Sequence, residues 1–139
     1  MTAVETRGVL LRAVAFGAWL AVAAGAVMAK GPVVAKPAEG AEREIAALID
    51  GLAQSSCRFS RNGSWYDGAR AADHLRRKYD YLRKRDLADT SEQFIERAAS
   101  RSSVSGRAYR VACPGEPERD AGSWFQQRLQ VLRHHSADA

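Results

Sequence analysis

The amino-acid sequence predicts a small α+β domain, in which about four helices pack over one face of an antiparallel sheet of two to three strands. Three observations point to this class. The spacing of apolar residues switches several times between the helical period and the two-residue period of a strand. An Asn-Gly pair, the strongest short-range signal of a β-hairpin, separates two short alternating segments. The two cysteines, Cys57 and Cys113, both fall on predicted strands, and the expected order is helix, hairpin, helix, helix, strand, helix.

Residues 1–29 have the three parts of a secretory signal peptide. Arg7 and Arg12 precede an uncharged apolar run, and small residues then provide a cleavage site after Ala29, with Ala26 as the second choice. A membrane anchor is the competing interpretation, but the run is shorter than the roughly 20 strongly apolar residues that span a bilayer. We therefore expect a periplasmic or secreted protein with no membrane span after cleavage.

The mature chain is expected to begin with a flexible lead-in over residues 30–40, which is rich in Pro and Gly and has no periodicity. A single domain is expected over residues 41–133. Its first helix carries an apolar stripe at spacings of three and four residues, and Ser55-Ser56 ends it. The stripe consists of Ile45, Leu48, Ile49 and Leu52.

A hairpin is expected next, with its turn at Asn62-Gly63. Cys57 and Phe59 alternate with polar residues before the turn, and Trp65 and Tyr66 follow it on a short return strand. Aromatic side chains on a hairpin can form a ligand platform. A domain of this size, however, needs its large side chains inside, so we expect at least one of the two aromatic residues of the return strand in the core.

Helix caps mark the next two elements. Asp67 is placed to cap a second helix over about Gly68–Arg83 by accepting its free N–H groups. Thr90 and Gln93 then have the spacing of a capping box, which opens a short third helix. The residues that this short helix is expected to bury are Phe94, Ile95 and Ala98.

The last third of the chain is expected to contain one strand and one helix. A serine-rich loop over residues 100–106 leads into a strand over residues 108–113, and residues 114–122 are expected to form a loop. Ser123 is expected to cap the last helix, and residues 134–139 to form a frayed tail. The residues expected to be buried in that helix are Trp124 or Phe125, Leu129 and Leu132.

An even number of cysteines in a small exported domain indicates a disulfide. If the two cysteines lie opposite each other on antiparallel strands, Phe59 faces Val111. Two residues further along, Arg61 then faces Tyr109. Both apolar faces agree in this register, and a slip by one residue would turn every side chain to the other face. The sequence therefore predicts one disulfide and a strand pair held in register by it.

The charge of the chain limits the class of partner. The net charge is +5 at pH 7, and removal of residues 1–29 takes away two arginines and one glutamate, which lowers it by one. On an exported protein such a surface favours an acidic envelope component or an acidic protein as partner, whereas export makes nucleic acid an unexpected one. No group of His, Cys and Asp has the spacing of a zinc site, so we expect no metal and no cofactor.

His74 is the one histidine within the expected domain, and it lies at the edge of the apolar stripe of the second helix. A general base needs a nucleophile and usually an orienting carboxylate within hydrogen-bond reach. Ser102, Ser103 and Ser105 can supply a hydroxyl, but no spacing specifies that geometry. A packing or hydrogen-bonding role for His74 is therefore favoured over catalysis.

Two further motifs have a functional and a structural interpretation. The loop over residues 102–106 can hold an anion with its hydroxyl and N–H groups, but the same residue types make a tight turn and cap a helix. The basic runs over residues 76–78 and 83–85 are typical of a solvated helix face. Together with the net charge, they can also steer an acidic partner.

Several ordered blocks run through the domain. They are Arg61-Asn62-Gly63, Ala71-Ala72-Asp73-His74-Leu75 with Lys78, Thr90-Ser91-Glu92-Gln93-Phe94-Ile95, and Ser102-Ser103 with Gly106, Tyr109 and Val111. Over residues 44–132 the chain thereby resembles the YfeK-like family of small bacterial periplasmic proteins of undefined function. The resemblance implies an envelope location and a single domain, and it brings no catalytic residue. The matching polar residues, where we expect a binding site, are Asn62, His74, Lys78, Ser102, Ser103 and Tyr109.

Together these observations favour a non-enzymatic binding or inhibitor module, whose contact surface is the polar set and the basic second helix. Ser105-Gly106 and Tyr109 are also similar to the loop that lysozyme inhibitors insert into an active site. Two alternatives stay open: a small periplasmic hydrolase that uses a serine and His74, and a purely structural envelope protein. A concave pocket with His74 beside a serine favours the enzyme, and a flat or convex polar patch favours the binder.

Overall fold

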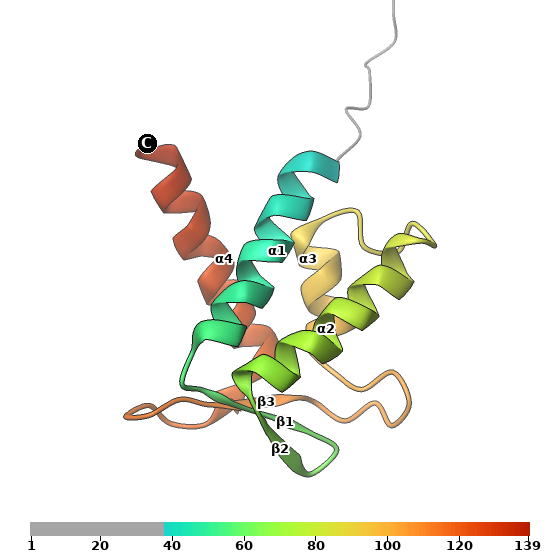
Figure 1. Cartoon of the computed structure of the whole chain (residues 1–139), viewed down its shortest axis with the longest axis vertical. Helices are drawn as coiled ribbons and strands as arrows, with labels where there is room; N and C mark the ends of the chain where they lie inside the picture. The colour runs from blue at the N-terminus through green and yellow to red at the C-terminus, as the bar shows by residue number, and fades with distance from the viewer. Residues whose placement is uncertain (1–37) are drawn as a thin grey trace, which may run out of the picture. The chain divides into compact units, whose positions relative to one another are not determined.

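Helices cover one side of a four-stranded antiparallel sheet in the part of the chain that the computed structural model describes, residues 38–139 (Figure 1). The α+β class and the element order predicted from the sequence are confirmed. The expected signal peptide and most of the lead-in lie outside the described residues. The elements in chain order are α1 (Ala38–Gln54), β1 (Arg58–Arg61), β2 (Ser64–Asp67), α2 (Gly68–Arg83), α3 (Ser91–Phe94), the π-helix η1 (Ile95–Ala99), β3 (Arg110–Ala112), β4 (Arg119–Asp120) and α4 (Ala121–Ala137).

The β1–β2 hairpin forms where the sequence predicts it. Arg61 pairs with Ser64, which leaves a two-residue loop. Its residues, Asn62 and Gly63, have φ angles of 50° and 84°, and positive φ at both positions is the mark of a type I′ turn. Asn tolerates this conformation and Gly adopts it freely, so the turn fixes the register of the hairpin.

The sheet has one strand more than predicted, in the order β2-β1-β3-β4. Arg119–Asp120 pairs with β3 inside the segment expected to be a loop. Two residues are too few to produce an alternating pattern in the sequence, and ion pairs of Arg110 hold the strand instead. The Arg110 guanidinium lies 2.8 Å from the Glu118 carboxylate and 2.6 Å from that of Asp120.

Phe59 faces Val111 in the β1–β3 ladder, as predicted. The expected pair of Arg61 and Tyr109 is not formed, because the ladder ends at Arg110 and the backbone of Tyr109 bonds elsewhere. Its N–H donates to the Ser100 carbonyl and its carbonyl accepts from the Ala121 N–H, both at 2.9 Å.

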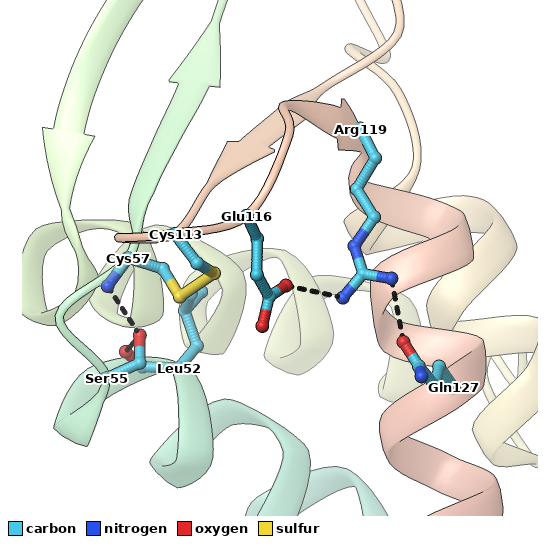
Figure 2. Close-up of a disulfide and its surroundings, with 7 residues drawn as sticks. All are labelled: Leu52, Ser55, Cys57, Cys113, Glu116, Arg119 and Gln127. Carbon is cyan, nitrogen blue, oxygen red and sulfur yellow. Dashed lines mark hydrogen bonds and ion pairs between the residues drawn. A yellow bond between two sulfur atoms is a disulfide. The ribbon is translucent and has the colours of Figure 1, made fainter.

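The predicted disulfide joins Cys57, directly before β1, to Cys113, directly after β3 (Figure 2). Cys57 is buried, and its N–H donates to the Ser55 hydroxyl at 3.3 Å. The same hydroxyl donates to the Leu52 carbonyl at 2.7 Å, which fastens the end of α1 to the start of β1. The disulfide therefore ties together the two central strands, at the ends that lie next to the C-terminus of α1.

The core lies between the helices and the sheet. The whole apolar stripe of α1 is buried, as are the predicted residues of α3 and η1. Trp124 and Phe125 are both buried, where the sequence left open which one would be; their ring centroids lie 4.9 Å apart. Among residues 38–139, no helix combines the length and the apolar character that crossing a membrane needs.

The helix caps confirm part of the prediction and correct another part. The Asp67 carboxylate accepts from the Arg70 N–H at 2.8 Å, and Thr90 accepts from the Gln93 N–H at 3.1 Å. The reciprocal bond of the predicted capping box is shifted by one residue, because the Gln93 side chain accepts from the Asp89 N–H at 2.8 Å.

The first and the last helix, α1 and α4, are longer than predicted. α1 begins at Ala38, inside the expected lead-in. α4 begins at Ala121 with Asp120 as its cap residue, not at Ser123, because β4 leads directly into it. It continues to Ala137, so the expected frayed tail is wrong for residues 134–137. Its last turns are fastened by Arg133, which lies 2.9 Å from Glu44 of α1.

Candidate anion-binding site

The hairpin and α2 face each other across a small pocket. Alternation along β1 places Phe59 and Arg61 on the same side of the sheet, and Tyr66 lies opposite Phe59 on β2. Arg70, His74 and Arg77 are spaced by four and three residues, so they share one side of α2. The pocket has a volume of about 100 Å³ and is lined by Phe59, Arg61, Tyr66, Arg70, Ala71, His74 and Arg77. None of these lining residues is acidic.

Arg61 contacts both the histidine and the tyrosine that line the pocket. It donates to Nδ1 of His74 at 2.8 Å, and its guanidinium lies 5.3 Å from the centre of the Tyr66 ring. The Arg70 guanidinium lies 5.6 Å from the same ring. Cation–π contacts of this kind hold a guanidinium in place without neutralising it.

The three pocket arginines keep their charge uncompensated within the described part of the chain. Arg61, Arg70 and Arg77 are absent from its ion pairs, which involve other arginines. Burial, assisted by the positive charge of Arg61, lowers the pKa of His74 to about 4. His74 is therefore neutral at pH 7 and can accept a hydrogen bond from Arg61.

The polar residues singled out from the sequence lie beside this pocket. The other ring nitrogen of His74, Nε2, lies 3.3 Å from the same guanidinium nitrogen of Arg61 and 3.5 Å from the Tyr109 hydroxyl. Lys78 donates to the same hydroxyl at 3.4 Å and to the Arg101 carbonyl at 3.1 Å. Burial lowers the pKa of Lys78 to about 8 and raises the pKa of Tyr109.

A second part of the polar set joins the serine loop to the hairpin turn. Asn62 donates to the Ser102 hydroxyl at 3.4 Å and accepts from the Ser105 hydroxyl at 2.6 Å. The Ser102 hydroxyl also accepts from the N–H groups of Val104 and Ser105. The serines therefore shape their own turn. Ser103 is exposed and its side chain makes no hydrogen bond within residues 38–139.

The structure thus brings together five of the six predicted binding residues, but two of these are not available for contact. Tyr109 is 2 % exposed and Ser102 is 5 % exposed. They brace the loop and the hairpin against α2, whereas two of the pocket arginines, Arg70 and Arg77, are exposed and Arg61 is half-buried. The sequence contained a signal for two of these arginines, because the spacing of Arg70, His74 and Arg77 is that of one helix side.

The expectation that Trp65 or Tyr66 lies in the core is wrong. Both are half-buried, because β2 is an edge strand and arginine side chains cover its rings. The Arg58 guanidinium lies 5.6 Å from the centre of the Trp65 ring, in the same way as Arg61 and Arg70 lie over Tyr66.

The geometry gives little support to two of the functional hypotheses. The pocket is concave and holds His74, but the partners of this histidine are Arg61 and Tyr109, with neither a serine hydroxyl nor a carboxylate within hydrogen-bond distance among the described residues. A loop that inserts Tyr109 into an enzyme needs that side chain exposed. Across residues 38–139, no three His, Cys, Asp or Glu side chains converge as metal ligands do.

Comparison with known proteins identifies relatives of the chain. A relative from Salmonella typhimurium, the uncharacterised protein YfeK, is 42% identical over 69 residues, which are 49% of this chain and 56% of the relative. The chain thus matches little more than half the length of this relative. No solved structure matches. The resemblance read from the ordered sequence blocks is confirmed, and the family of unknown function DUF5329 matches over residues 39–133. The chain therefore belongs to the DUF5329 family.

Proposed function

We propose that this protein is an exported, non-enzymatic binding module, which takes one anionic group of its partner into the pocket between the hairpin and α2. The observation that supports it is the set of three uncompensated guanidinium groups around a pocket without a carboxylate. Like charges that converge without a counter-ion repel each other, and an anion from outside relieves that repulsion.

The pocket suits a carboxylate or phosphate oxygen pair. A guanidinium presents its N–H donors in a planar fork that matches such groups in a bidentate manner. Arg61 is already oriented by His74 and Tyr66, so little side-chain entropy is lost when an anion binds. Phe59 and Ala71 form an apolar floor, which weakens the competition of water for the same donors.

Export is the second part of the proposal. It is supported by the basic and apolar N-terminal segment with its cleavage site and by the disulfide, since such bonds persist in oxidising compartments. Cell fractionation and N-terminal sequencing test it. The proposal expects a periplasmic or secreted protein that begins after Ala29 or Ala26, and a cytosolic protein with its leader intact contradicts it.

The binding role is tested by titrating the purified protein with triglutamate, a short acidic peptide, and following amide shifts by NMR. R61Q/R70Q removes two pocket charges and is expected to weaken binding at least tenfold, since even one charge-assisted hydrogen bond contributes about 1.5–3 kcal/mol. The matched control is R76Q/R83Q, which also removes two charges, both from α2 and both outside the pocket. Arg76 and Arg83 are paired with acidic residues of α1.

The control is expected to bind triglutamate like the wild type. Equal weakening in both variants would mean that only the net charge matters, and the pocket would then have no role. Amide shifts on Arg61, Tyr66 and Arg70 locate the peptide, and shifts confined to other parts of the domain also contradict the proposal.

A further inference from the structure

We infer that the partner is an acidic segment of another protein, which lies along the outer side of α2 and places one carboxylate in the arginine pocket. This inference rests on the proposed anion-binding role of the pocket and extends it to the partner's class. The outer row is defined as Arg70, His74, Arg77, Tyr81, Lys84 and Arg85, which recur at spacings of three or four residues and therefore lie on one side of the helix and its C-terminal cap.

The arginines of α2 fall into two rows with different environments. Arg76 and Arg83 are seven residues apart and face α1, where they lie 2.8 Å from Asp50 and 3.6 Å from Glu42. Figure 1 shows α1 and α2 packed side by side, with the opposite side of α2 turned away from α1. The charges of this inner row are therefore compensated within the fold.

The outer row is compensated by no acidic residue of the described chain. Arg70, Arg77, Lys84 and Arg85 are exposed and absent from the ion pairs of residues 38–139. The two carboxylates that α2 contains, on Asp73 and Asp80, pair with the inner row instead. A stripe of uncompensated cations, with the neutral His74 and Tyr81 between them, thus runs from the pocket to the end of the helix.

One tyrosine, Tyr81, lies within this stripe, and its ring carries a stacked guanidinium group. Tyr81 is 56% exposed, and the Arg85 guanidinium lies 3.7 Å from the centre of its ring. Tyr66 holds two guanidinium groups in the pocket in the same way. Exposed Tyr and Arg side chains that are already ordered are the residues that contribute most to protein–protein binding.

The pocket favours a polypeptide over a lipid surface. A volume of about 100 Å³ accepts the end of an acidic side chain, because its carboxylate is attached through a single carbon chain and can enter the pocket end-on. The phosphate of a phospholipid carries a substituent on each side and lies in a flat layer, so it cannot enter a concave site as deeply. An acidic protein segment also supplies carboxylates at intervals that match a stripe.

The length of the stripe sets the length of the segment. From Arg70 to Arg83 the helix advances 13 residues, which corresponds to about 20 Å at the helical rise of 1.5 Å per residue, and Lys84 and Arg85 follow directly. An extended peptide spans about 3.3 Å per residue, so about seven residues reach from one end to the other. A tripeptide is too short to occupy both the pocket and Arg85.

The test compares triglutamate with decaglutamate on the purified protein at low salt. Decaglutamate is expected to bind the wild type at least tenfold more tightly. K84Q/R85Q is expected to lower the affinity for decaglutamate about fivefold, since exposed charge pairs contribute up to about 1 kcal/mol each, and to leave triglutamate binding unchanged. R76Q/R83Q removes the same number of charges from the inner row and is expected to keep the wild-type affinity for both peptides. Thermal unfolding confirms that each variant is folded.

Three outcomes overturn the inference. Equal loss of decaglutamate binding in K84Q/R85Q and R76Q/R83Q means that binding follows net charge alone. Unchanged decaglutamate binding in K84Q/R85Q means that the partner does not reach the end of the stripe. Binding to phosphatidylglycerol vesicles that depends on Lys84 and Arg85, without such dependence for decaglutamate, assigns the row to a membrane. If triglutamate fails to bind while the length-dependent effect of K84Q/R85Q persists, the pocket is refuted and the stripe is not.

Discussion

Reduction of the Cys57–Cys113 disulfide is expected to lower the free energy of unfolding by about 4 kcal/mol. The bond joins cysteines that are 56 residues apart in the sequence. In the chain-entropy model, closing a loop of this length removes about 14 cal/mol/K from the unfolded state, which corresponds to about 4 kcal/mol at 25 °C. A domain of this size has roughly 5–15 kcal/mol in total, so the reduced protein is expected to be only marginally stable.

Urea denaturation of the oxidised and the reduced wild-type protein, followed by circular dichroism, measures this difference. Both forms have the same side chains, so the comparison isolates the cross-link from the packing of the sulfur atoms. The control is C57A/C113A, whose unfolding curve must not respond to the reductant. The reasoning would be refuted if the free energies of unfolding of the two wild-type forms differed by less than about 1 kcal/mol while both showed the same slope against urea concentration. The cross-link would then leave the unfolded ensemble unrestricted.

Three further predictions concern stability. Gly68→Ala puts a methyl group against a backbone carbonyl of α1 and is expected to lower the free energy of unfolding by about 2 kcal/mol. Gly51→Ala, at an open and exposed position of α1, is expected to raise it by up to about 1 kcal/mol. Urea denaturation measures both, and a change in the same direction for the two variants would contradict the prediction. His74 has a folded-state pKa of about 4, below its usual 6.5, so the folded state binds fewer protons and stability is expected to fall as the pH drops from 6.5 towards 4. An NMR titration midpoint of His74 at 6.5 or above would exclude this. Arg133→Gln removes the partner that lowers the pKa of Glu44. Since the pair is partly exposed, we expect the free energy of unfolding to fall by about 1 kcal/mol at pH 7, and this loss to shrink as the pH drops below 4.5. An equal loss at pH 3 would contradict the ion-pair explanation.

The parts of the fold that local chemistry specifies could be predicted from the sequence. The turn at Asn62-Gly63 and the cap at Asp67 depend on residues within a few positions, and the structure confirms both. The parts that were missed depend on distant partners. β4 exists through its pairing with β3, and the last turns of α4 are held by the contact of Arg133 with Glu44, 89 residues away in the sequence.

The candidate site shows the same division. His74 and Lys78 could be named from the sequence, but the pocket arises from guanidinium groups on two elements, and the contact of Arg61 with His74 spans the hairpin and the helix. Composition also misled the interpretation of Tyr66. A large side chain in a small domain is expected to be buried. On the edge strand β2, however, the Tyr66 ring is half-buried and two arginine side chains stack on it.

The two rows of α2 imply that its two sides change differently during divergence within the family. An arginine of the inner row and its carboxylate on α1, such as Arg76 and Asp50, form a pair in which the loss of one leaves the other unmatched. Such positions should covary inside one polypeptide. The outer row has no ion-pair partner within residues 38–139. If an acidic segment of another protein binds it, as proposed, substitutions in the row should instead track changes in that protein across genomes, and this covariation would identify the partner.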